Sequence, residues 1–202
     1  MPMKLIVLAV LAAFQAGAAD ELRIWGRTWN VPVAADWTVD QNILRLISSR
    51  GPLPGPRRPI QFALTDVPAY RRLTVDADLM PAGRSLLIVV AYRDAAHFDY
   101  AHLSTDQAEE QPVHNGIFHV YGGERVRISS ERGPAAFAAK DRWHHVVLKH
   151  DARSGTIEVT VDGRELEALR AVDLSLGPGK VGVGSFDETG AFRNVRITFD
   201  VP

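Results

Sequence analysis

The chain of 202 residues contains no cysteine. Disulfide bridges, thiol chemistry and thiolate-bound metal sites are therefore excluded. Its charge is almost balanced, with 23 Lys and Arg against 24 Asp and Glu. The sequence has no run of basic residues of the kind that contacts a phosphate backbone, so we expect no nucleic-acid partner. Helical periodicity longer than one or two turns is missing after residue 18, which argues against a helical fold.

One apolar run has the features of a targeting signal. Lys4 precedes the run Leu5–Phe14, and Ala16-Gly17-Ala18 supplies small residues at an A-x-A cleavage position. This is the plan of a secretory signal peptide, and the run is too short to span a bilayer. We expect residues 1–18 to be removed, leaving one domain, residues 19–202, that is secreted or periplasmic and not held in a membrane.

Short strands and turn signals make up most of the remaining chain. The run Ser85–Tyr92 is apolar throughout, which is typical of a strand covered on both faces. The segment GPLPGPRRP, residues 51–59, predicts a loop. We therefore predict an all-β, antiparallel two-sheet sandwich or jelly roll. The predicted strands are Trp37–Val39, Leu44–Leu46, Ile60–Leu64, Arg72–Met80, Ser85–Tyr92, Arg142–Asp151, Thr156–Asp162, Arg164–Leu166, Lys180–Ser185 and Phe192–Phe199.

The second half of the chain carries a more specific pattern. It runs from W-x-x-V at Trp143 through TIEVTVDG, ending at Gly163, to GKVGVGS and FRNVRI. This order resembles the concanavalin A-like lectin/glucanase jelly roll, and most of all its laminin G-like and 3-keto-disaccharide hydrolase-like secreted bacterial domains. The matching residues are mostly framework, so the resemblance implies the fold and not a function. It also implies that a ligand would lie across a concave sheet.

A hairpin around Gly122 and Gly123 forms the centre of the candidate site. A two-residue turn would mix apolar and charged side chains on each face. A three-residue loop that includes Glu124 separates them, and burial of one face favours that register. The polar face is then His119, Tyr121, Arg125 and Arg127, and the buried face is Phe118, Val120, Val126 and Ile128.

Aromatic rings and forked hydrogen-bond donors of this kind suit a sugar ligand. Rings stack on the apolar face of a sugar, while Arg, Asn and His bond its hydroxyl groups. The preceding strand turns Tyr100 and His102 the same way, and His114-Asn115 lies in the loop before the hairpin. The predicted ligand-binding residues are Tyr92, Tyr100, His102, His114, Asn115, His119, Tyr121, Arg125 and Arg127.

The sequence predicts no metal site. It lacks both an H-x-H pair and an H-E-x-x-H motif. A structural calcium ion, common in the fold that the chain resembles, could use Asp162 or Asp187, but a simple turn role suits both residues better. We therefore expect no cofactor beyond such a calcium ion.

Whether the ligand is cleaved or only bound stays open at this stage. The pairs Asp76/Asp78 and Glu165/Glu167 are interpreted as solvated strand edges, so ordinary two-carboxylate glycoside hydrolysis is not expected. The resemblance implies an alternative, a hydrolase or lyase of 3-keto-glycosides, in which His102 or His114 acts as base and Arg125 as polarising donor. A weaker alternative is a laminin G-like module that binds another protein.

Overall fold

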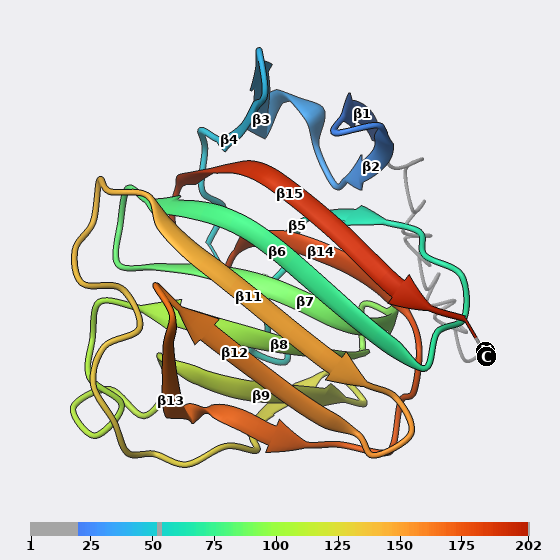
Figure 1. Ribbon diagram of the computed structural model, residues 1–202. Coiled ribbons are helices and arrows are strands. Elements are labelled where there is room, and N and C mark those ends of the chain that lie inside the picture. The colour runs from blue at the N-terminus through green and yellow to red at the C-terminus, as the bar shows by residue number, and fades with distance from the viewer. Residues whose placement is uncertain (1–19, 52–53, 202) are drawn as a thin grey trace, which may run out of the picture.

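Two antiparallel sheets packed face to face form the domain (Figure 1). The structure is a computed structural model that describes residues 20–51 and 54–201. The predicted signal segment, residues 1–18, lies outside the described residues. The all-β sandwich that the sequence predicts is confirmed. Nowhere in the described part of the chain is there a helix with the length and apolar character needed to cross a membrane.

The eight-stranded sheet has the order β1-β2-β5-β14-β7-β8-β9-β10. Its strands are β1 (Asp20–Ile24), β2 (Arg27–Val31), β5 (Gln61–Thr65), β14 (Lys180–Ser185), β7 (Ser85–Asp94), β8 (His97–Ser104), β9 (Gly116–Tyr121) and β10 (Glu124–Arg127).

The seven-stranded sheet, which faces the viewer in Figure 1, has the order β13-β12-β11-β6-β15-β4-β3. Its strands are β13 (Arg164–Val172), β12 (Thr156–Val161), β11 (His144–Asp151), β6 (Arg72–Pro81), β15 (Gly190–Asp200), β4 (Ile43–Leu46) and β3 (Trp37–Asp40). A single 3-10 turn, Ala34–Asp36, precedes β3.

The main core lies between the two sheets and follows from strand alternation. In β6, Leu73, Val75, Ala77 and Leu79 enter the core, as the alternating pattern predicts. The apolar side chains of β7 point alternately to the two faces of the sheet. Leu86 and Ile88 pack in the main core, while Leu87 and Val89 pack on the opposite face.

A second apolar cluster covers the other side of the eight-stranded sheet. We call it the outer cluster, and its residues are Phe62, Leu87, Val89, Phe98, Tyr100, Phe118, Val120 and Phe186. Its position confirms that β7 is covered on both faces. The predicted loop, described over Gly51 and residues 54–59, contains no strand, and it brings Pro56 and Arg58 close to Gly123 at the tip of the β9–β10 hairpin.

The predicted register of that hairpin is wrong. Tyr121 pairs with Glu124 and Val120 with Arg125, so the turn contains only Gly122 and Gly123. Both glycines have positive φ, +71° and +105°, as the tight turns of hairpins require. The physical reason is that the arginines suit an apolar face: the guanidinium groups of Arg125 and Arg127 lie over aromatic rings of the outer cluster. Val126, predicted to be buried, is 60% exposed.

The strands β5 and β14 approach each other closely at Gly184. A Cβ atom there would lie 2.0 Å from the carbonyl oxygen of Gln61 and 2.9 Å from the Cα atom of Phe62. No side-chain rearrangement can relieve a clash with the backbone of the neighbouring strand.

We therefore predict that Gly184→Ala lowers the free energy of unfolding by about 3 kcal/mol, through overpacking. Gly51→Ala is the control, because a Cβ atom at Gly51 would have no neighbour within 4 Å; it should change stability by less than about 0.5 kcal/mol. Urea denaturation of both variants measures the difference, and equal stabilities would contradict the close approach.

A buried histidine links stability to pH. His150 in β11 accepts or donates a 2.8 Å hydrogen bond through Nδ1 with the hydroxyl of Tyr70, and both side chains are buried. Burial lowers the pKa of His150 to about 4, although the nearby charges of Asp151 and Asp173 oppose the shift. Between about pH 6.5, the value for an unfolded chain, and pH 4, the unfolded state binds more protons than the folded state.

Stability should therefore fall as the pH falls through this window, by up to about 3 kcal/mol from His150. We predict that His150→Gln flattens the pH dependence by that amount. His145→Gln, which alters an exposed imidazole on the same strand, should leave the slope unchanged. Urea unfolding at pH 7 and pH 4.5 makes the comparison; parallel curves for wild type and His150→Gln would refute the assignment.

Candidate ligand-binding site

Five of the predicted ligand-binding residues lie on or beside the outer face of the eight-stranded sheet. Tyr92, Tyr100 and His102 point outward from β7 and β8, and His114 and Arg125 approach the same rings from the loop before β9 and from β10. We call this the outer-face site. Its residues are Tyr100, His102, His114, Phe118, Arg125 and Phe186.

Stacked rings form the floor of the outer-face site. Tyr100 lies parallel to Phe118, with ring centroids 5.2 Å apart, and His102 lies parallel to Phe186 at 6.3 Å. All four rings are buried. Sequence reasoning missed Phe118 and Phe186 as site residues, because the wrong register assigned Phe118 to the core between the sheets.

Arg125 covers this floor. Its guanidinium carbon lies 4.6 Å from the ring centroid of Phe186 and 5.4 Å from that of Phe118. Its Nη1 atom donates a long hydrogen bond of 3.4 Å to the hydroxyl of Tyr100. Burial raises the pKa of Tyr100 to about 12, although the charge of Arg125 opposes the shift, so this hydroxyl stays protonated and can both donate and accept.

Neither ring nitrogen of His102 forms a hydrogen bond of normal geometry within the described residues. Its side chain is only 2% exposed. Burial lowers the pKa of His102 well below its usual value, and the charges of His114 and Arg125 lower it further. The ring is therefore neutral, with one donor and one acceptor. The backbone of Val113 lies near enough to raise the pKa slightly, but neither ring nitrogen forms a hydrogen bond of normal geometry within the described residues.

A histidine–aspartate pair stands at the rim of the outer-face site. His114 Nδ1 lies 2.6 Å from Asp106 Oδ2, and the two side chains are 18% and 22% exposed. The ring of His114 meets that of His102 edge to face, 5.2 Å between centroids. The carboxylate fixes the ring, which leaves Nε2 of His114 free of that hydrogen bond.

Two predicted residues have a structural role in the surrounding loops. Arg127 donates hydrogen bonds to the backbone carbonyls of Pro112, His114, Asn115, Ser129 and Ser130. Asn115, which is fully buried with φ at +47°, donates to the carbonyl of Pro134 and accepts from the amide of Ala136. These bonds use most of the polar capacity of both side chains.

The last two predicted residues lie on the opposite face of the sheet. His119 Nδ1 is 2.7 Å from Asp99 Oδ1, and the ring of Tyr121 stacks on His119 with centroids 5.7 Å apart. Burial raises the pKa of Asp99 to about 7, although the hydrogen bond from His119 opposes the shift. The structure therefore separates His119 and Tyr121 from Arg125 and Arg127.

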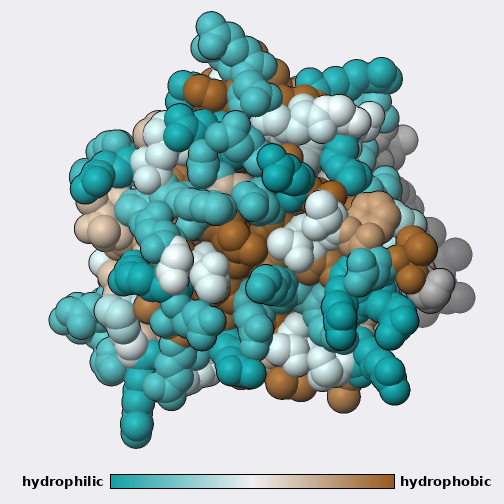
Figure 2. Space-filling model, in the orientation of Figure 1, coloured by the Kyte–Doolittle hydropathy of each residue, from teal (hydrophilic) through white to brown (hydrophobic). Residues whose placement is uncertain are grey.

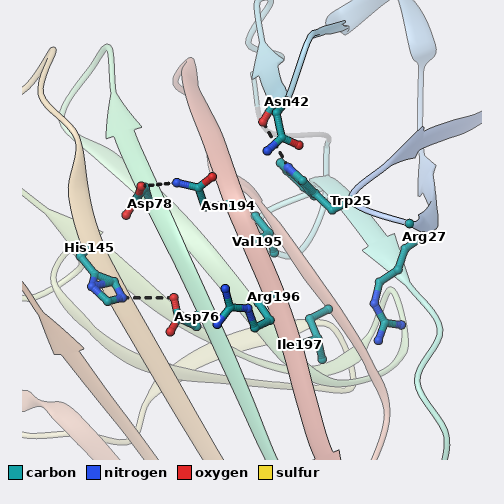
Figure 3. A pocket seen from close by; sticks show the side chains of 11 residues that line it. Trp25, Arg27, Asn42, Asp76, Asp78, His145, Asn194, Val195, Arg196 and Ile197 are labelled. Carbon is teal, nitrogen blue, oxygen red and sulfur yellow. Dashed lines mark hydrogen bonds and ion pairs between the residues drawn. The ribbon is translucent and has the colours of Figure 1, made fainter.

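A hollow of about 940 Å³ lies elsewhere, on the outer face of the seven-stranded sheet. Figure 3 shows Trp25 on one side of it, across from Asp76, Asp78 and His145. His145 Nε2 is 3.1 Å from Asp76 Oδ1, and Asn194 Nδ2 donates to Asp78 Oδ2 at 2.8 Å. Figure 2, which views the same face of the molecule, shows mainly hydrophilic residues with an apolar strip near the middle.

Sequence reasoning missed this hollow because Trp25 and Asp76 are far apart in the chain. The alternating Asp76 and Asp78 were interpreted as a solvated edge, but β6 is a central strand of its sheet. The three tryptophans within residues 25–37 are the sequence signal that could have indicated it, and Trp25 is half-buried and lines the hollow.

Comparison with known proteins shows which solved structures have a similar fold. No protein-family profile matches the chain, and no curated protein sequence is significantly similar to it. The fold is similar to that of the carbohydrate-binding module CBM66 from Bacillus subtilis, with a TM-score of 0.54, 16% identity and coverage of 89% of this chain and 91% of the other.

A GH43 glycoside hydrolase, engineered for endo-xylanase and exo-arabinofuranosidase activity, also matches, with a TM-score of 0.57 and 13% identity. That match covers 94% of this chain but 42% of the enzyme. At such identities the likeness shows the fold alone. The two-sheet sandwich is consistent with the concanavalin A-like jelly-roll fold that the sequence resembles.

Proposed function

We propose that this chain is a carbohydrate-recognising domain that binds glycan at the outer-face site of the eight-stranded sheet. The observation that carries the proposal is His102, a buried imidazole among aromatic rings that forms no hydrogen bond of normal geometry within residues 20–51 and 54–201. Buried polar groups in folded proteins are almost always hydrogen-bonded. A ligand hydroxyl that reaches this ring would supply the missing partner.

The surroundings of His102 have the composition of a sugar site. Phe118 and Phe186 offer apolar ring surface, while Arg125 offers a charged donor and His114 Nε2 an acceptor at the rim. Because Arg125 covers the floor, binding requires its side chain to swing from the rings toward the ligand. The names of CBM66 and the GH43 hydrolase, both of similar fold, refer to carbohydrate and support the same class of ligand.

The His114–Asp106 pair favours a second candidate function, cleavage of 3-keto-glycosides. A carboxylate that holds Nδ1 of a histidine keeps Nε2 available as a general base. In this role His114 would remove the C2 proton beside the ketone, and Arg125 would stabilise the charge that develops on the ketone oxygen. The enolate then forms the C1=C2 double bond and expels the glycosidic oxygen from C1, which leaves as an alcohol after protonated His114 returns its proton.

The test is a binding and turnover assay of the mature protein with a panel of glycosides and their 3-keto derivatives. We predict that Arg125→Ala weakens binding of the preferred sugar about tenfold or more, because a charged hydrogen bond contributes about 1.5–3 kcal/mol. Arg170→Ala, an exposed arginine on β13 paired with Glu158, is the matched control and should bind normally. Product formation that His114→Ala abolishes would favour the enzyme over the binding domain.

The same panel distinguishes the two faces of the molecule. Trp25→Ala removes the indole of the hollow on the seven-stranded sheet and should leave binding unchanged. If Trp25→Ala abolishes binding while Arg125→Ala does not, the sugar lies in that hollow and the outer-face site is the wrong location. If no sugar binds at all, the proposal of carbohydrate recognition fails.

A further inference from the structure

Three potential metal ligands converge at one end of the sandwich. They are Asp99 in β8, His119 in β9 and Asp173, which follows β13, and one ligand atom from each lies within 4.8 Å of the others. His119 Nδ1 is 2.7 Å from Asp99 Oδ1 and 3.6 Å from Asp173 Oδ2. β8 and β9 belong to the eight-stranded sheet and β13 to the seven-stranded sheet, so the cluster bridges the two layers.

This cluster differs from the other histidine–aspartate pairs in the described residues. His97, His114, His144 and His145 each contact a single aspartate. His119, in contrast, contacts two aspartates, Asp99 and Asp173. The chain therefore provides its own comparison between an ordinary pair and the three-residue group.

The cluster also lacks a counter-charge. Asp99 is 1% exposed and the side chain of Asp173 is 14% exposed, yet within residues 20–51 and 54–201 neither carboxylate forms an ion pair with Lys or Arg. Two ionised carboxylates held this close and away from water repel each other, so either one of them is protonated or a positive charge lies between them. A single imidazole cannot balance two carboxylates, whereas a divalent cation can.

The spacing fits a bound ion. Zn²⁺ binds imidazole nitrogen and carboxylate oxygen at about 2.1 Å, so two ligand atoms on a tetrahedral ion lie about 3.4 Å apart. The two separations from His119 Nδ1, 2.7 Å and 3.6 Å, fall on either side of that value. Tetrahedral ligation would lengthen the separation between His119 Nδ1 and Asp99 Oδ1 by about 0.7 Å and shorten that to Asp173 Oδ2 by about 0.2 Å.

We propose that Asp99, His119 and Asp173 bind a divalent transition-series cation, with Zn²⁺ the expected occupant. The imidazole disfavours Ca²⁺ and Mg²⁺, which take oxygen ligands. Three protein ligands leave a fourth position for water, on the side where His119 is partly exposed. The ion links β8 and β9 to the segment after β13 and so connects the two sheets. This site is additional to the outer-face site and does not depend on the proposed sugar function.

The test starts from mature protein freed of metal by chelation and dialysis. Titration calorimetry with Zn²⁺ should show one ion bound per chain, and Zn²⁺ should raise the melting temperature by about 5 °C or more, because it binds the folded state. Asp173→Asn and His119→Ala should each abolish both effects. With Co²⁺ in place of Zn²⁺, the wild type should show the visible absorption bands of a cobalt ion bound by nitrogen and oxygen. Both variants should lack these bands.

Asp162→Asn is the matched control. Asp162 lies 2.8 Å from His144, and among the described residues His144 contacts no second carboxylate. The Asp162→Asn variant should bind Zn²⁺ as the wild type does. Binding that survives in His119→Ala, or a wild-type protein that binds no Zn²⁺, would overturn the proposal. A preference for Ca²⁺ over Zn²⁺ in the same titration would overturn the assignment of the ion. Circular dichroism of each variant confirms that loss of binding is not loss of fold.

Discussion

The eight-stranded sheet is apolar on both faces, and the rest of the structure follows from that constraint. Packing against the seven-stranded sheet covers Leu86 and Ile88 of β7, but it leaves Leu87 and Val89 to be covered separately. An exposed apolar face of that size would be costly in water. Arg125 and Arg127 lie across the rings of the outer cluster and shield them, keeping their charged ends accessible to polar partners. The apolar face thus positions the guanidinium groups of the candidate site.

Imidazole groups show a second organising principle. Most histidines of the described residues pair with a nearby aspartate, which fixes the ring and its tautomer. Three depart from that rule: His150 pairs with the hydroxyl of Tyr70, His102 has no hydrogen bond of normal geometry within the described residues, and His119 has two carboxylates. A ring with too few partners and a ring with too many are both places where a ligand can complete the structure. This reasoning leads to the proposed sugar site in one case and to the proposed cation site in the other.

Much of the fold could be predicted because strand patterning is local. Ser85–Tyr92 was correctly predicted as a strand buried on both faces, and the alternation in β6 identified its core face. Neither β1 nor β2 was predicted; β1 is an edge strand whose residues Asp20–Ile24 are largely exposed, and β2 is its neighbour. The hairpin register was wrong for a different reason. Arginine counts as polar in a binary pattern, whereas here its guanidinium group stacks on Phe118.

The sequence by itself determined the strands, the turns and the sandwich, since these depend on periodicity and on residues such as glycine at tight turns. It also selected Tyr100, His102, His114 and Arg125 as candidates, and the structure places these four side chains close together. Only the tertiary structure decided which side chains face one another: Trp25 with Asp76 and Asp78 around the hollow, and His119 with Asp99 and Asp173 at the end of the sandwich. The physical reason is that strand order and register set these contacts, and a shift of one residue turns every side chain of a strand to the other face.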